Sequence, residues 1–183
     1  RPRPAGRVRP RHRADPRPPL GGQPRIGDHG GVPVVVTAAD SPLGRAVVDA
    51  LLRAPGPAEV RATVRDRTAV PELLELGVRT AVGAWNDQAA DALQLGGALE
   101  GAHTVVHLDG PESSWDLLLD AAQDTGVRRL VTAWPSGVEP PAAGGYELVV
   151  VRAAAHRPTP ALVDALVAAD RRERVRGLEI VDL

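Results

Sequence analysis

The sequence predicts one α/β domain built around a parallel sheet, and three observations support this prediction. Short β-branched runs such as Val34 to Val36 are typical of strands that are covered on both faces. Segments with apolar residues at helical spacing alternate with these runs. The chain of 183 residues is long enough for one domain with a sizeable core. We therefore expect a doubly wound parallel sheet over residues 32–183.

Residues 1–31 differ in composition from the rest, because they are rich in Arg, Pro and Gly and poor in apolar side chains. Such a segment buries too little apolar surface to offset the entropy lost on ordering, so we predict a flexible, disordered arm. Residues 1–25 contain eight Arg against one Asp. Attachment to nucleic acid or another polyanion is one interpretation. A solvated leader and upstream sequence outside the mature protein are the alternatives.

Absent residue types exclude several kinds of chemistry. Without cysteine the chain forms no disulfide, thiolate metal site or thiol nucleophile. All 22 Lys and Arg positions are Arg, which excludes any mechanism that needs a lysine amino group. The sequence contains no apolar stretch of about 18 residues and no apolar signal segment. We expect a cytoplasmic protein without a membrane partner.

The first predicted strand is followed by the turn TAADSPLG, residues 37–44, and apolar positions recur at helical spacing from Leu43 onward. In a parallel sheet, such a turn brings backbone N–H groups to a helix N-terminus, where the pyrophosphate of a dinucleotide binds. Asp-Ser-Pro is equally an ordinary start of a helix. Both interpretations remain open at this point.

This turn resembles the TGxxGxxG turn of the short-chain dehydrogenase/reductase superfamily, especially its extended (NAD-dependent epimerase/dehydratase) and atypical (NmrA-like) branches. The resemblance implies a Rossmann-like domain that binds NAD or NADP. The implied contacts are Thr37, Ala38, Ser41, Pro42, Leu43 and Gly44. The three glycines of the pattern fall on Ala38, Ser41 and Gly44, and the first two make room for phosphates. Because Asp40 would repel a pyrophosphate and Pro42 lacks an N–H, we expect weakened phosphate binding.

Residues 60–67, VRATVRDR, are predicted as the second strand. In the family, an acidic residue past this strand bonds the adenosine ribose, whereas arginines accept the extra phosphate of NADP. Arg65 and Arg67 therefore favour NADP over NAD, and Asp66 is the opposing signal. As charges at the surface end of a strand, all three need no ligand to explain them.

A short helix around residues 71–76 precedes a segment, residues 77–110, that resembles the family runs "LGVxxVxGDxxD", "ALxGxD" and "xVxHLA". The acidic residue that commonly faces the adenine is replaced by Ala84, which leaves Asn86 and Asp87 as polar substitutes. Asp87 is equally a helix N-cap. The resemblance implies that His107 and Leu108 lie near the cofactor. We predict no metal site, because His103 and His107 in an extended segment would lie about 13 Å apart.

Residues 113–139 resemble the run "LLxAAxxxGVxRLVxxSSxxV", whose strand end carries the family's catalytic Ser or Thr. Thr132 and Ser136 are the weak catalytic candidates there, with His107 as a third. The family also needs a Tyr and, four residues later, a Lys. The single tyrosine, Tyr146, is followed at that distance by Val150 and lies in a predicted strand. A last helix starting at Thr159 and Pro160 and a final strand complete the prediction.

Three functional hypotheses follow from these patterns. The first is a degenerate, non-catalytic nucleotide-binding, regulatory or interaction module. The second is an atypical NADP-dependent oxidoreductase or a sugar-nucleotide-type epimerase/dehydratase that works without the Tyr/Lys pair. The third is a scaffold whose residues 1–31 bind a polyanion. A protein partner or a homodimer is compatible with each, although the short segment before the helix near Trp115 implies a weakened or different dimer contact.

Overall fold

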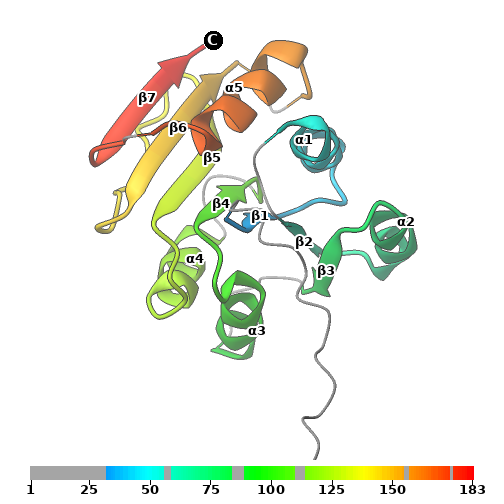
Figure 1. Cartoon of the computed structure of the whole chain (residues 1–183). Helices are drawn as coiled ribbons and strands as arrows, with labels where there is room; N and C mark the ends of the chain where they lie inside the picture. The colour runs from blue at the N-terminus through cyan, green and yellow to red at the C-terminus, as the bar shows by residue number, and fades with distance from the viewer. Residues whose placement is uncertain (1–31, 56–58, 84–88, 110–113, 155–156, 174) are drawn as a thin grey trace, which may run out of the picture.

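The computed structural model describes residues 32–55, 59–83, 89–109, 114–154, 157–173 and 175–183. They form a seven-stranded sheet with the strand order β3-β2-β1-β4-β5-β6-β7 (Figure 1). Every neighbouring pair of strands is parallel. The predicted doubly wound α/β sheet is confirmed.

The elements follow one another with short connections. The strands are β1 (Val34–Val36), β2 (Val60–Val64), β3 (Arg79–Val82), β4 (Thr104–His107), β5 (Arg129–Pro135), β6 (Glu147–Ala153) and β7 (Leu178–Asp182). The helices are α1 (Pro42–Arg53), α2 (Val70–Glu75), α3 (Ala89–Leu99), α4 (Trp115–Ala122) and α5 (Pro160–Asp170), and a 3₁₀ turn, η1, spans Arg67–Ala69.

Two hydrophobic cores lie on opposite faces of the sheet. Helices α1, α2 and α5 cover one face, and α3 and α4 cover the other (Figure 1). Because side chains alternate along a strand, Val34 and Val36 enter the first core while Val35 enters the second. This two-sided burial explains why β1 is a continuous run of valine.

The predicted second strand, residues 60–67, is too long, because β2 ends at Val64. The N–H groups of Arg65 and Asp66 bond the side chain of Asp40 instead of a neighbouring strand. The Asp66 side chain then accepts a hydrogen bond from the Thr68 N–H and starts η1. The residues past β2 are therefore held in a turn.

The connection from β5 to β6, residues 136–146, contains no helix. In this connection Ala143 and Tyr146 pack against the core that α3 and α4 cover. The edge strand β7 leaves Leu178 and Ile180 partly exposed. In the described part of the chain, no helix is long and apolar enough to cross a membrane.

Strands β2 and β4 flank β1, so their carboxyl ends meet beside the turn that follows β1. The chain reaches β2 by way of α1 on one face of the sheet, and it reaches β4 by way of α3 on the other. This reversal is a topological switch point, where open α/β sheets bind their ligands.

Candidate nucleotide site

The turn after β1 keeps the backbone course of a glycine although its first glycine position holds alanine. Ala38 has a φ of +47° and is the single described non-glycine residue with a positive φ. For an L-residue this conformation costs roughly 1–2 kcal/mol. The Ser41 N–H donates to the Ala38 carbonyl at 2.9 Å and closes the turn.

Gly44, on the third glycine position, packs directly against this turn. A Cβ atom at Gly44 would lie 2.1 Å from the carbonyl oxygen of Ala38 and 2.8 Å from the Cα of Ala39. No side chain fits there unless the backbone moves. The retained glycine therefore serves the packing of α1 against the strand, as the resemblance implies.

The N-terminus of α1 uses most of its donors internally. Ser41 is the N-cap, and its Oγ accepts a hydrogen bond of 3.0 Å from the Gly44 N–H. Pro42, the first helical residue, has no N–H. Of the first three helical residues, this leaves the N–H of Leu43 to meet a phosphate at the positive end of the helix dipole.

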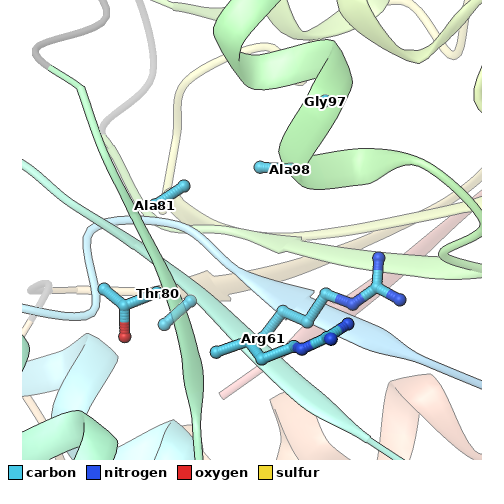
Figure 2. Close-up of a pocket in the computed structure, with 7 residues that line it drawn as sticks. Arg61, Thr80, Ala81, Gly97 and Ala98 are labelled. Carbon is cyan, nitrogen blue, oxygen red and sulfur yellow. The ribbon is translucent and has the colours of Figure 1, made fainter. Parts of the chain in front are cut away.

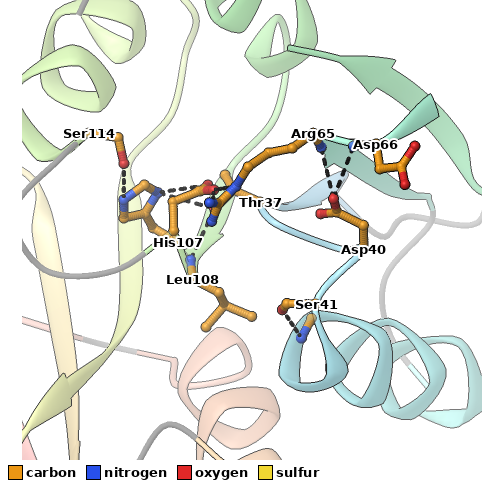
Figure 3. Close-up of polar contacts among 10 residues, drawn as sticks. Thr37, Asp40, Ser41, Arg65, Asp66, His107, Leu108 and Ser114 are labelled. Carbon is orange, nitrogen blue, oxygen red and sulfur yellow. Dashed lines mark hydrogen bonds and ion pairs between the residues drawn. The ribbon is translucent and has the colours of Figure 1, made fainter. Parts of the chain in front are cut away.

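Asp40 ties the turn to the end of β2. Its Oδ2 accepts hydrogen bonds from the N–H groups of Arg65, at 3.1 Å, and of Asp66, at 3.0 Å (Figure 3). Its Oδ1 is buried and has no hydrogen-bond partner among the described residues. The sequence analysis predicted only a repulsive charge at Asp40 and missed these hydrogen bonds to the residues after β2.

Arg65 extends from the end of β2 across the carboxyl end of β1 (Figure 3) and pairs with Asp109, two residues after the end of β4. Its Nε and Nη2 lie 3.1 Å and 2.9 Å from the same oxygen, Oδ1 of Asp109. The Arg65 side chain is 54% exposed and the Asp109 side chain 4%. Arg67 is exposed at the start of η1 and takes no part in this ion pair.

His107 lies at the end of β4 and is 1% exposed. Its Nδ1 is 3.2 Å from the Thr37 hydroxyl, and its Nε2 is 3.0 Å from the Ser114 hydroxyl (Figure 3). The Thr37 Oγ1 also accepts a hydrogen bond from the Leu108 N–H at 2.9 Å. Both ring nitrogens of a neutral imidazole are thus satisfied inside the protein.

Burial lowers the pKa of His107 from 6.5 to about 4. The carboxylate of Asp109 opposes this effect, and the positive charge of Arg65 adds to it. His107 therefore stays neutral at physiological pH, and its ring serves as a structural hydrogen-bond partner of Thr37 and Ser114.

The other catalytic candidates lie in three different settings. Thr132 is buried inside β5, and its hydroxyl donates to the His107 carbonyl at 3.0 Å. Ser136 is exposed beyond the end of β5. Tyr146 precedes β6, so it lies at the amino edge of the sheet, opposite the switch point, and burial raises its pKa.

The remaining predicted contacts divide into two groups. Thr37, Leu108 and the turn lie together at the switch point, whereas Asn86 and Asp87 fall outside the described residues. In the described ranges, no group of three or more His, Asp or Glu residues is placed to hold a metal ion.

A separate cavity of about 180 Å³ lies between α3 and the strands β2 and β3 (Figure 2). Arg61 and Arg79 line it, near the amino ends of their strands. Both pair with Glu59, at 3.0 Å and 3.3 Å, and the hydrogen bond from Arg61 lowers the pKa of that carboxyl. Because it opens near the amino ends of the strands, this cavity is separate from the switch point.

The arrangement at the switch point suits some parts of a dinucleotide better than others. The N–H of Leu43 is available to a pyrophosphate at the start of α1, and Asp40 brings a negative charge close to it. Arg65, half exposed at the end of β2, is a bidentate donor suited to a phosphate monoester. The chemistry of the donor set therefore fits an adenosine 2′-phosphate well and a pyrophosphate poorly.

Comparison with known proteins places this site in a family. Residues 39–179 match the family described as NAD(P)H-binding. The comparison with curated proteins found no match.

Three solved structures are similar to this chain to different extents. Pen from Bacillus thuringiensis is 12% identical over 67% of this chain and 50% of its own, with a TM-score of 0.54. NmrA, a negative transcriptional regulator, is 16% identical over 67% of this chain and 45% of its own, with a TM-score of 0.51. The triphenylmethane reductase of Citrobacter sp., complexed with NADP(H), is 24% identical over 55% of this chain and 36% of its own, with a TM-score of 0.45.

The chain thus spans half or less of these three proteins. At their identities, Pen and NmrA show the likeness of fold alone. The family match over residues 39–179 goes further because it covers more than half of the chain. The chain belongs to the NAD(P)H-binding family and folds as a Rossmann-like domain.

Proposed function

We propose that this domain is a non-catalytic, regulatory member of its family that binds NADP(H) weakly and passes its presence on to a protein partner. One observation carries the proposal. Neither titratable ring that the sequence offers for proton exchange, His107 or Tyr146, is available to a substrate at the carboxyl edge of the sheet. His107 is buried with both ring nitrogens engaged, and Tyr146 lies at the opposite edge.

The choice of NADP over NAD rests on Arg65. A 2′-phosphate offers the guanidinium a dianionic partner, whereas the unmodified ribose of NAD offers hydroxyl groups only. The turn around Ala38 would hold the pyrophosphate less firmly, because Asp40 places a negative charge there and Pro42 has no N–H. Weak binding of the whole dinucleotide, dominated by its adenosine half, is the expected result.

The test is a titration of the full chain with NADPH and NADH, followed by cofactor fluorescence, together with a turnover assay. We expect saturable NADPH binding with a Kd of roughly 10 µM to 1 mM, which corresponds to about 4–7 kcal/mol. NADH should bind at least about tenfold more weakly. Oxidation of NADPH in the presence of quinones and aldehydes should not exceed the rate without protein.

Turnover above that background would contradict the proposal and favour the atypical oxidoreductase. Thr132→Ala and Ser136→Ala variants would then separate the two hydroxyl candidates. The scaffold hypothesis depends on residues 1–31, which lie outside the described residues. A pull-down with and without these residues tests it.

A further inference from the structure

We propose that Asp109 is a built-in competitor of the cofactor: its ion pair with Arg65 closes the adenosine end of the crevice and opens when a 2′-phosphate takes over the guanidinium. This inference rests on the proposed function, since it concerns the regulation of the same site. It adds a residue, Asp109, to which the family pattern gives no role, because the run "xVxHLA" has alanine at that position.

The position of the pair is the first argument. Strand β1 lies between β2 and β4, and the Arg65 side chain spans from one flanking strand to the other (Figure 3). The crevice outside the carboxyl ends of these strands is where a dinucleotide lies in this type of sheet. A ligand entering there meets the Arg65 side chain first.

The unequal burial of the two partners is the second argument. Arg65 is 54% exposed and can turn toward solvent, whereas Asp109 is 4% exposed and cannot follow it. Oδ1 of Asp109 accepts a hydrogen bond from the Arg65 Nε–H and lies 2.9 Å from Nη2, and Oδ2 has no hydrogen-bond partner among the described residues. When Arg65 leaves, a buried carboxylate loses its bonded cation, which is costly.

The surroundings of Asp109 offer little replacement for that cation. Besides Arg65, the described residues bring His107 near Asp109, with its Nδ1 4.0 Å from Oδ2 of Asp109 and 3.2 Å from the Thr37 hydroxyl. Because the imidazole is neutral, it provides no positive charge to the carboxylate. Opening is therefore compensated only by a ligand that binds Arg65 more strongly than Asp109 does.

A 2′-phosphate is such a ligand, because it carries up to two negative charges and accepts bidentate hydrogen bonds from a guanidinium. NADH and adenosine 5′-phosphates have no phosphate at this place. The ion pair thus lowers the affinity for ligands with a 2′-phosphate, which must displace Asp109 to reach Arg65, whereas a ligand without this phosphate gains nothing from opening the pair. Asp109 acts through Arg65 and is a specificity-determining positioning residue.

The experiment compares binding of 2′-AMP and 5′-AMP to the full chain and to the variants Asp109→Asn and Asp109→Ala. Asparagine keeps the shape of the side chain, and alanine is the residue of the family run, so at least one variant should fold. We expect each to bind 2′-AMP about tenfold or more tightly than the unchanged chain, and 5′-AMP with less than about a twofold change. Melting temperatures verify that the variants are folded.

Two controls separate this effect from a change in overall charge. Glu75→Gln removes the same charge at the exposed end of α2, and its 2′-AMP affinity should change less than about twofold. Arg65→Ala should abolish the preference for 2′-AMP, and adding Asp109→Asn to it should give no further gain. An equal gain with and without Arg65 would overturn the proposal, because Asp109 would then act by simple repulsion.

The outcomes also distinguish this proposal from the function on which it rests. If the Asp109 variants gain 2′-AMP affinity while NADPH still fails to bind, the competition stands and the proposed cofactor is wrong. If folded Asp109 variants bind 2′-AMP no better than the unchanged chain, Asp109 does not withhold Arg65 and the proposal fails.

Discussion

At Ala38, the burial of the methyl group stabilises the fold, and the unfavourable backbone conformation destabilises it. The φ of +47° favours glycine, yet the methyl group is almost fully buried. Relief of strain in a glycine variant is worth roughly 1–2 kcal/mol, whereas the lost methyl burial and the greater freedom of the unfolded chain together cost about the same. The two effects nearly cancel at this residue.

We therefore expect Ala38→Gly to change the free energy of unfolding by less than about 1 kcal/mol. Ala39→Gly is the matched control, because Ala39 is also buried but has no positive φ. It should destabilise the domain by about 1–2 kcal/mol, because it loses the methyl group and gains no relief. Urea denaturation of both variants measures the difference, and equal losses would show that Ala38 is unstrained.

His107 gives the domain a defined dependence of stability on pH. Because its folded pKa of about 4 lies below the unfolded value of 6.5, the unfolded chain takes up the proton first as the pH falls. The contribution is complete above about pH 6.5 and is lost between about pH 6.5 and 4, and roughly 2 kcal/mol of it disappears between pH 7.5 and 5. Asp109 and Arg65 are the charged groups that face the ring and modulate this value.

A His107→Gln variant should lose about 2 kcal/mol less than the unchanged chain when the pH is lowered from about 7.5 to 5. Glu59 and Asp66 do not obscure this difference between about pH 7.5 and 5. Their carboxyl pKa values are lowered, so their contribution to stability is lost only in more acidic solution. Urea denaturation at the two pH values is the measurement. Parallel pH profiles for both proteins would show that His107 is not the titrating group.

Residue-level prediction from the sequence succeeded where a strand end marks the site. Thr37, Arg65 and His107 each lie at the end of a strand or just past it, and the structure brings them together. Asp109 and Ser114 were missed. Asp109 lies two residues past the end of β4, which was the available signal, but its pairing with a residue 44 positions away depends on the strand order.

At the scale of elements, the start of α1 depends on one glycine. A Cβ at Gly44 would meet the backbone of the turn at 2.1 Å, and no side-chain rotation relieves this. The helix and the turn would have to separate, which disturbs the close packing of β1 and α1.

We expect Gly44→Ala to destabilise the domain by about 3 kcal/mol or more. Gly97→Ala is the control, since Gly97 also lies in a helix but a Cβ there meets nothing within 4 Å. It should stabilise the domain by up to about 1 kcal/mol through helix propensity. Thermal unfolding followed by circular dichroism compares the two variants. Equal melting temperatures of Gly44→Ala and Gly97→Ala would contradict the packing argument at Gly44.

The type and order of the elements were predictable because period and burial are local properties of the sequence. The ends of two strands were not. Strand β2 stops at Val64 because Asp40, from a distant turn, takes the next two N–H groups. Strand β5 runs on to Pro135, which leaves Thr132 inside the sheet and not at its end.

At the scale of the whole molecule, charge is divided between the arm and the domain. The whole chain has a net charge of −1, and residues 1–25 carry an excess of Arg. The rest of the chain is therefore clearly acidic. Removal of residues 1–31 should shift the melting temperature by less than about 2 °C, because the arm composition does not support a core. Binding to heparin or single-stranded DNA, measured at two salt concentrations, should be lost with the arm.

A fall in melting temperature of about 5 °C or more on this deletion would mean that residues 1–31 pack on the domain, since such a shift corresponds to roughly 1 kcal/mol. Retained polyanion binding would assign this binding to the domain instead.

The architecture itself was predictable from the sequence, whereas the ion pair between Arg65 and Asp109 at the switch point arises only when β2 and β4 assemble around β1.

The strained turn affects how easily this sequence could acquire glycine at positions 38 and 41 by mutation. Every alanine codon becomes a glycine codon by one base substitution, and the residue at position 38 already follows a glycine backbone course. Replacing the N-cap Ser41 by glycine costs only a few tenths of a kcal/mol. Two amino-acid substitutions, neither of which passes through an unstable intermediate, therefore separate this chain from the full glycine pattern, so the loss is readily reversible by mutation.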